Sequence, residues 1–125
     1  MLQVTSTDKA PAAIGPYSQA IEYNGILFTS GQVPLDPATG AVVGSDITEQ
    51  AEQVMKNLGA ILEANDLDYT AAIKTTCFLA DMADFAAFNE VYGRYFTSKP
   101  ARSCVAVKTL PKNVLCEVEV IAAKE

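Results

Sequence analysis

The polar residues of this 125-residue chain that could carry chemistry form a short set: Tyr17, Ser30, Asn89, Arg102, Cys104 and Glu117. The chain contains no histidine. This excludes a Ser-His-Asp or Cys-His nucleophile system, and any zinc site that uses histidine, within one chain. Acid–base and binding chemistry must therefore come from carboxylates, Arg, Lys, Tyr, Ser, Asn or Cys side chains.

Arg102 and Glu117 are the charged members of this set. Arg102 opens a predicted strand, where its planar guanidinium can bind a carboxylate through two parallel hydrogen bonds. Judged by position alone, an exposed arginine at a strand end is the more common situation. Glu117 and Glu119 share one strand face with their Cβ atoms about 7 Å apart. Such a pair permits acid–base catalysis, but it is also typical of a solvated strand face.

The remaining candidates also have ordinary structural interpretations. Cys104 could act as a nucleophile only if Arg102 or a backbone dipole activated it, and a small buried thiol is the more common role. Tyr17 follows Gly15-Pro16, and Ser30 precedes Gly31. Glycine allows a ligand to approach the backbone closely, but it also marks ordinary turns.

Asn89 lies four residues after Phe85 and three before Tyr92 in a predicted helix. This spacing places its amide either on the inward side, where it needs hydrogen-bond partners, or at the solvent edge of the helix.

Composition excludes several classes of function. The chain has 9 Lys and Arg against 15 Asp and Glu, a net charge of −6, and no basic tract, which disfavours nucleic-acid binding. No nucleotide-binding glycine motif or calcium loop is present. The three cysteines form no CxxC pair and fit a reducing compartment, with Cys77 and Cys116 expected in the core. No signal peptide or membrane span is predicted, so we expect a cytoplasmic protein without a membrane partner.

The apolar pattern predicts one α+β domain over residues 1–125. Strands are predicted at 17–23 and 26–30, joined by an Asn24-Gly25 type I′ turn. A helix of about 17 residues follows, capped by Asp46 or Thr48, with Asp46 and Glu49 at capping-box spacing. A strand at 73–79, a helix at 82–96 capped by Asp81, and strands at 103–108 and 115–122 complete the order, with a further short strand at 2–6.

These strands carry apolar residues on both faces, whereas two helices can cover only one face of a sheet. An uncovered apolar face must meet another subunit, so we expect an oligomer; small loops covering that face in a monomer are the alternative. If the last two strands formed a simple hairpin, Arg102 and Glu117 would lie about 13 Å apart. Either these strands are not neighbours, or the site is completed across subunits.

Several blocks of the sequence, in order, resemble the RidA (YjgF) family of reactive intermediate deaminases, over nearly the whole chain. The most specific block, Pro100-Ala101-Arg102-Ser103-Cys104-Val105, has a glutamate fifteen residues after its arginine. The other blocks are residues 10–19, 29–34, 84–89, 110–113 and 117–119. The connection at 97–99 is shorter than expected for the family.

The resemblance implies a fold like that of Bacillus chorismate mutase: a mixed sheet with two helices on one face, and a homotrimer whose sheets form a central barrel. Ligand clefts would lie between subunits, and the strand at 73–79 would lie between the last two strands. The implied activity is hydrolysis of enamines and imines such as 2-aminoacrylate or 2-iminobutanoate to 2-keto acids and ammonia. No cofactor or metal is implied.

The resemblance also assigns roles to the candidate residues. Arg102 would bind the substrate carboxylate, and Glu117 would activate water or transfer a proton. Main-chain groups would assist at Gly31 and Cys104, and the cleft would be lined by Tyr17, Ser30 and Asn89. Alternatives are a regulatory trimer that binds 2-keto acids, a surface chaperone activity, and an endoribonuclease or translation inhibitor, which the charge and the absence of histidine disfavour.

Overall fold

The computed structural model describes residues 1–124. Its longest helix, α1 (Ile47–Glu63), begins where predicted, because the Asp46 side chain accepts a hydrogen bond from the Glu49 N–H at 2.8 Å. The Glu49 carboxylate in turn accepts from the Ser45 N–H at 2.9 Å, so the reciprocal contact reaches one residue beyond the expected capping box. The 17-residue length agrees with the predicted apolar stripe.

The second helix is shorter than the predicted range 82–96. A 3₁₀ turn (Met82–Asp84) comes first, and α2 (Phe85–Tyr95) follows. Asp81 caps the 3₁₀ turn by accepting from the Ala83 N–H at 2.8 Å, so it closes the turn before α2 rather than α2 itself. The inward face of α2 buries Phe88, Val91 and Tyr92.

The sheet has six strands in the order β1-β2-β3-β6-β4-β5, and only β4 and β5 are parallel. The strands are β1 (Gln3–Thr5), β2 (Ala20–Tyr23), β3 (Ile26–Thr29), β4 (Ala72–Leu79), β5 (Ala101–Ala106) and β6 (Cys116–Ala123). Asn24 and Gly25 both have positive φ, as a type I′ turn requires. The strand β2 is shorter than predicted because the backbone turns before Ala20, where Tyr17 N–H bonds the Gly15 carbonyl.

The strand β4 lies between β5 and β6, which excludes a simple hairpin of the last two strands. In this register, Arg102 is opposite Thr75, and Thr75 is opposite Val120. Glu117 is opposite Phe78, three residues farther along β4. The insertion of β4 that the family resemblance implied is therefore confirmed.

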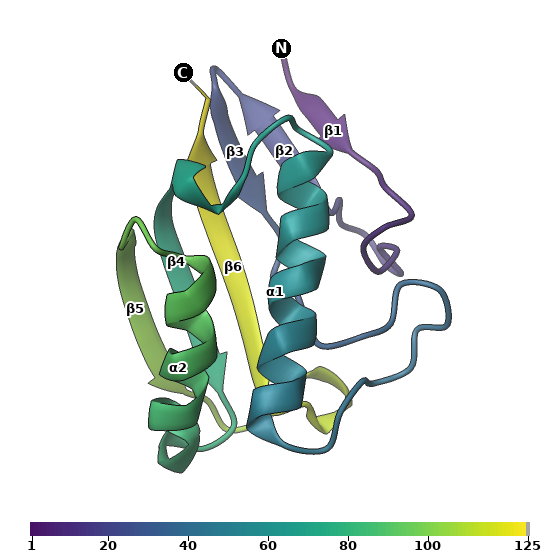
Figure 1. Cartoon of the computed structure of the whole chain (residues 1–125). Coiled ribbons are helices and arrows are strands. Elements are labelled where there is room, and N and C mark those ends of the chain that lie inside the picture. The colour runs from purple at the N-terminus through teal and green to yellow at the C-terminus, as the bar shows by residue number, and fades with distance from the viewer. Residues whose placement is uncertain (125) are drawn as a thin grey trace.

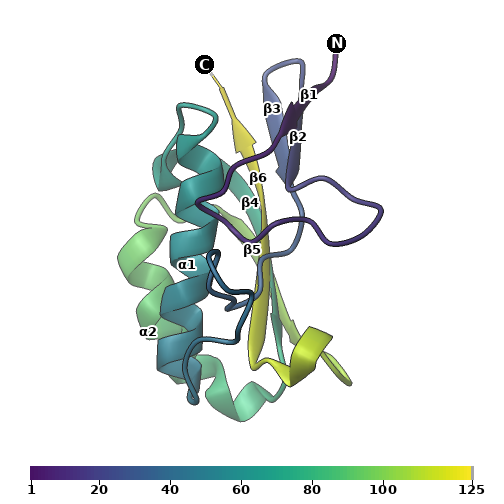
Figure 2. The same cartoon turned by 90° about the vertical axis from the view of Figure 1, so that its right-hand side faces the viewer.

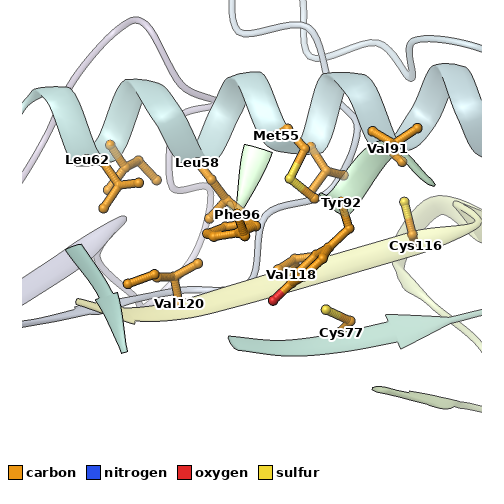
Figure 3. Close-up of a cluster of buried hydrophobic side chains, with 14 of the residues drawn as sticks. Met55, Leu58, Leu62, Cys77, Val91, Tyr92, Phe96, Cys116, Val118 and Val120 are labelled. Carbon is orange, nitrogen blue, oxygen red and sulfur yellow. The ribbon is translucent and has the colours of Figure 1, made fainter. Parts of the chain in front are cut away.

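Both helices pack on the same face of the sheet (Figures 1 and 2). The core between them contains side chains of α1, α2, β4 and β6, including the fully buried thiols of Cys77 and Cys116 (Figure 3). On the opposite face, large apolar side chains remain accessible in this chain, with Phe28 48% and Val105 47% exposed. The predicted mixed α+β sheet with helices on one face is confirmed.

Candidate functional site

Arg102 points from β5 to the helix face of the sheet, where side chains of α2 contact its guanidinium. Its Nη1 donates a hydrogen bond to the Asn89 side-chain oxygen at 2.6 Å. Its Cζ lies 4.8 Å from the ring centroid of Tyr92 and 5.5 Å from that of Phe85. These distances are typical of cation–π contacts.

The three side chains around Arg102 come from one stripe of α2. Phe85, Asn89 and Tyr92 are spaced i, i+4 and i+7, so they project from the same side of the helix. Asn89 therefore takes the inward position, and Arg102 is its partner. Within residues 1–124 Arg102 forms no ion pair with a carboxylate. The guanidinium contacts one amide oxygen and the faces of two aromatic rings, and its remaining N–H groups are available to an anion.

Cys104 lies on the same face as Arg102, opposite Cys77 in the parallel ladder. Burial raises the pKa of the Cys104 thiol, and the nearby Arg102 charge only partly opposes this effect. A thiol with a raised pKa is a weak nucleophile at neutral pH. The environment of Cys104 therefore favours packing by the side chain over covalent chemistry.

A second group of candidates lines a cleft of about 450 Å³ that contains Tyr17, Ser30, Gly31 and Glu117. Glu117 alternates along β6 with Cys116 and Val118, which are buried under the helices. Its carboxylate therefore points to the other face of the sheet. A Cβ atom on Gly31 would lie 2.0 Å from Glu117 Oε2, so glycine at this position leaves room for the carboxylate.

Backbone pairing and one buried amide position the walls of this cleft. The N–H of Gln32 bonds the Val118 carbonyl at 2.8 Å, which places Gly31 beside Glu117. Gln19 is 4% exposed, and its side chain bonds the backbone of Thr7 and of Pro11. These bonds hold the loop that carries Tyr17, whose side chain is half exposed. Ser30 Oγ donates to the Ser18 carbonyl at 2.6 Å.

Several residues around both groups were not among the candidates predicted from the sequence. Gln19, Gln32, Ile14 and Lys112 also line the cleft. All four lie within the blocks that resemble the family, but nothing in their spacing predicts that they line a cleft. Tyr92 was not among the candidates, although its spacing from Asn89 is the signal that places both side chains on the helix face that meets Arg102.

Burial raises the pKa of the Glu117 carboxyl, and the neighbouring Glu119 charge raises it further. Both effects disfavour the ionised form. An environment of this kind allows a carboxyl group to exchange a proton nearer to neutral pH. Glu117 and Glu119 share one strand face, as predicted from the sequence, and the charge of Glu119 opposes ionisation of Glu117.

The two groups lie on opposite faces of the sheet. Arg102, Cys104 and Asn89 meet on the helix face, whereas Glu117, Gly31, Ser30 and Tyr17 meet on the other. A single chain therefore does not bring Arg102 and Glu117 to one small ligand.

Among residues 1–124, no group of three or more potential ligands converges to hold a metal ion. No helix in the same range has the length and apolarity needed to cross a membrane.

Comparison with known proteins gives one consistent result. The family model described as Endoribonuclease L-PSP matches residues 7–124. Reactive Intermediate Deaminase A of Arabidopsis thaliana is 51% identical to the chain over 121 residues, covering 96% of this chain and 65% of that protein. The chain belongs to the RidA family.

Two further RidA relatives are informative. The 2-iminobutanoate/2-iminopropanoate deaminase of Mus musculus is 49% identical over 123 residues, covering 98% of this chain and 91% of the mouse protein. The crystal structure of E. coli TdcF with bound serine superposes with a TM-score of 0.93 at 42% identity, covering 98% of this chain and 99% of TdcF. The chorismate mutase-like fold expected from the sequence is thus confirmed.

Proposed function

We propose that this protein hydrolyses 2-iminobutanoate and 2-iminopropanoate, and their enamine tautomers, to 2-keto acids and ammonia. The observation that carries the proposal is the half-buried Arg102, whose positive charge has no carboxylate partner within residues 1–124. The relatedness to a mouse protein named for this activity supports the same substrate class. The substrates are small carboxylates, which a guanidinium binds through paired hydrogen bonds.

We assign binding of the substrate carboxylate to Arg102. Asn89 occupies Nη1, so the other N–H groups of the guanidinium remain for the ligand. Main-chain groups near Cys104 and Gly31 would complete this end of the site. Cys104 would contribute its backbone and not its thiol, in agreement with the raised pKa of that thiol.

Glu117 is assigned the proton transfers. As a carboxylate it accepts a proton from the water that adds to the electrophilic C=N carbon, and it passes this proton to nitrogen, giving a neutral carbinolamine. It then accepts the proton of the carbinolamine hydroxyl and delivers it to nitrogen, so that the C–N bond breaks, the C=O bond forms, and ammonia leaves with the 2-keto acid. The raised pKa of Glu117 suits a group that alternates between both forms. Because imines already hydrolyse in water, positioning of substrate and water suffices for catalysis.

The opposite placement of Arg102 and Glu117 leads us to propose that the site forms between copies of the chain. The uncovered sheet face exposes the apolar side chains of Val4, Phe28 and Val105. Burying such side chains is favourable at about 25 cal/mol per Å² of apolar surface. We propose the homotrimer that the family resemblance implies, with Tyr17, Ser30, Gly31 and Glu117 from one subunit facing Arg102, Asn89 and Cys104 of the next.

The experiment that tests the function couples this protein to a PLP-dependent serine or threonine dehydratase, which releases the imine. Release of pyruvate or 2-ketobutyrate is followed with and without the protein, and semicarbazide traps the remaining imine. We expect faster keto-acid release and less semicarbazone. Equal semicarbazone in both reactions would contradict the proposal.

The family description also names an endoribonuclease. A net charge of −6 and the absence of histidine oppose binding and cleavage of RNA in this chain. A regulatory trimer that only binds 2-keto acids would need Arg102, but it would not need Glu117 held against Gly31. A catalytic function therefore explains the position of Glu117, which a function in binding alone does not.

A further inference from the structure

Tyr92 lies directly beside the guanidinium of Arg102, and its hydroxyl has a buried partner. The hydroxyl oxygen is 2.7 Å from Thr75 Oγ1. Thr75 is fully buried, at 0% exposure, and Tyr92 is 8% exposed. Figure 3 shows Tyr92 reaching from α2 to the sheet, with its oxygen at the sheet end.

The pairing of β4 with β5 positions both Arg102 and Thr75. Thr75 is the Cα partner of Arg102 in the parallel β4–β5 ladder, so both side chains leave the sheet on the helix face. The branched Cβ of threonine restricts its side-chain rotation, which makes Thr75 a rigid anchor. The ring of Tyr92 is therefore held at one end by α2 and at the other by β4, with Arg102 against its face.

Core packing alone does not require this hydroxyl. The ring neighbours of Tyr92 are Phe88 and Phe96, with centroids 5.9 Å and 4.8 Å away, and these fill the same layer without a polar atom. Burying two hydroxyls contributes little net stability, whereas leaving either one unpaired is costly. What the Thr75–Tyr92 bond does provide is a fixed ring orientation.

We propose that Tyr92, anchored by Thr75, is a positioning residue for Arg102: it supports one face of the guanidinium while Asn89 holds one edge. The remaining N–H groups are thereby aimed at the substrate carboxylate before it binds, which reduces the ordering cost of binding. This inference rests on the proposed function for its ligand, but the geometry of Arg102 can be tested separately.

The decisive variant is Tyr92→Leu, which removes the ring, with Tyr95→Leu as its matched control. Tyr95 is on the same helix, but its hydroxyl bonds Glu52 at 2.8 Å and its ring packs on Tyr69, away from Arg102. Thr75→Val removes the anchor and keeps the ring, and Thr75→Ser keeps a hydroxyl at that position. These two variants keep the test available if Tyr92→Leu fails to fold.

Three measurements apply to each variant: the Kd of 2-ketobutyrate by calorimetry, KM and kcat for imine hydrolysis, and NMR relaxation of the Arg102 side-chain Nε–H. We expect Tyr92→Leu to raise the Kd roughly tenfold, which is the size of the ordering cost of one long side chain that must be immobilised on binding. KM should rise with kcat little changed, because carboxylate binding acts equally on ground and transition states. Thr75→Val should loosen Arg102 in the same direction, and Thr75→Ser, which keeps the hydroxyl but loses the branched Cβ, should loosen it less than Thr75→Val does.

The positioning role would be overturned if a folded Tyr92→Leu variant kept its Kd within twofold of the parent and kept Arg102 as ordered as in the parent. If only Thr75→Val folds, the same result in that variant would overturn it. Equal effects in Tyr95→Leu would do the same, because they would show general loosening of α2. A parent protein that neither binds 2-ketobutyrate nor hydrolyses imines would contradict the proposed function instead. In that case the Arg102 relaxation would still decide whether Tyr92 orders the guanidinium.

Discussion

The placement of Arg102 and Glu117 on opposite sheet faces leads to a quantitative prediction for mixed oligomers. Arg102→Ala removes the carboxylate-binding group, and losing one partner of a buried charge pair costs about 2–5 kcal/mol, at least roughly thirtyfold in activity. Glu117→Gln removes the proton-transfer group. Each variant alone should be nearly inactive. Refolding the two together should restore activity, because one chain then supplies Glu117 and its neighbour supplies Arg102.

The expected recovery follows from the geometry. If every site uses Glu117 of one chain and Arg102 of the next around a closed ring, random mixing in equal amounts makes about one quarter of the sites intact. If both residues act from the same chain, no site is intact at any mixing ratio. The assay is keto-acid release in the coupled dehydratase reaction, with native mass spectrometry showing that mixed species near three times 13.3 kDa have formed.

A matched control distinguishes complementation from stabilisation by mixing. Arg102→Ala refolded with the double variant Arg102→Ala/Glu117→Gln contains intact Glu117 but no Arg102, so it should stay inactive. Recovery no greater than this control, in a sample where mixed oligomers are present, would refute the shared site. Either both residues would then act from the same chain, against their placement on opposite sheet faces, or one of them would take no part in catalysis.

Other substitutions test the site residue by residue. Gly31→Ala should lower kcat with little loss of unfolding free energy in urea titration, because its Cβ displaces only the flexible Glu117 side chain; unchanged kcat would contradict this role of Gly31. Burial and the Glu119 charge raise the pKa of Glu117 in the folded state above its value in the unfolded chain. The Glu117 carboxyl therefore stabilises the folded state at a pH below the pKa of the unfolded chain. This stabilisation is lost as the pH rises through the pKa of the folded state. Glu117→Gln should therefore unfold at higher urea than the parent at pH 7 and lose this advantage below about pH 4; an equal midpoint at pH 7 would argue against the burial effect. Cys104→Ser should keep most of the activity, because burial raises the pKa of that thiol; a loss as large as that of Arg102→Ala in an assembled variant would show that the thiol takes part.

Local features of the chain were predictable because short-range interactions decide them. The Asn24-Gly25 turn needs two residues with positive φ, and the apolar stripe of α1 repeats at helical spacing whatever its surroundings. Alternation along the strands also placed Arg102 with Cys104, and Glu117 with Glu119, on common faces. The resemblance to a family added roles for these residues that no local pattern carries.

The sequence by itself therefore determined the elements, the pairs of residues that share a face, and the identity of the candidate site residues. Only the tertiary structure decided that β4 separates β5 from β6, that Arg102 meets Asn89 and Tyr92 under α2, and that Glu117 faces the other side. Strand order depends on which distant segments pair, and that choice is made by burial of whole faces against the helices. Alternation states which residues share a face, but not which face the helices cover.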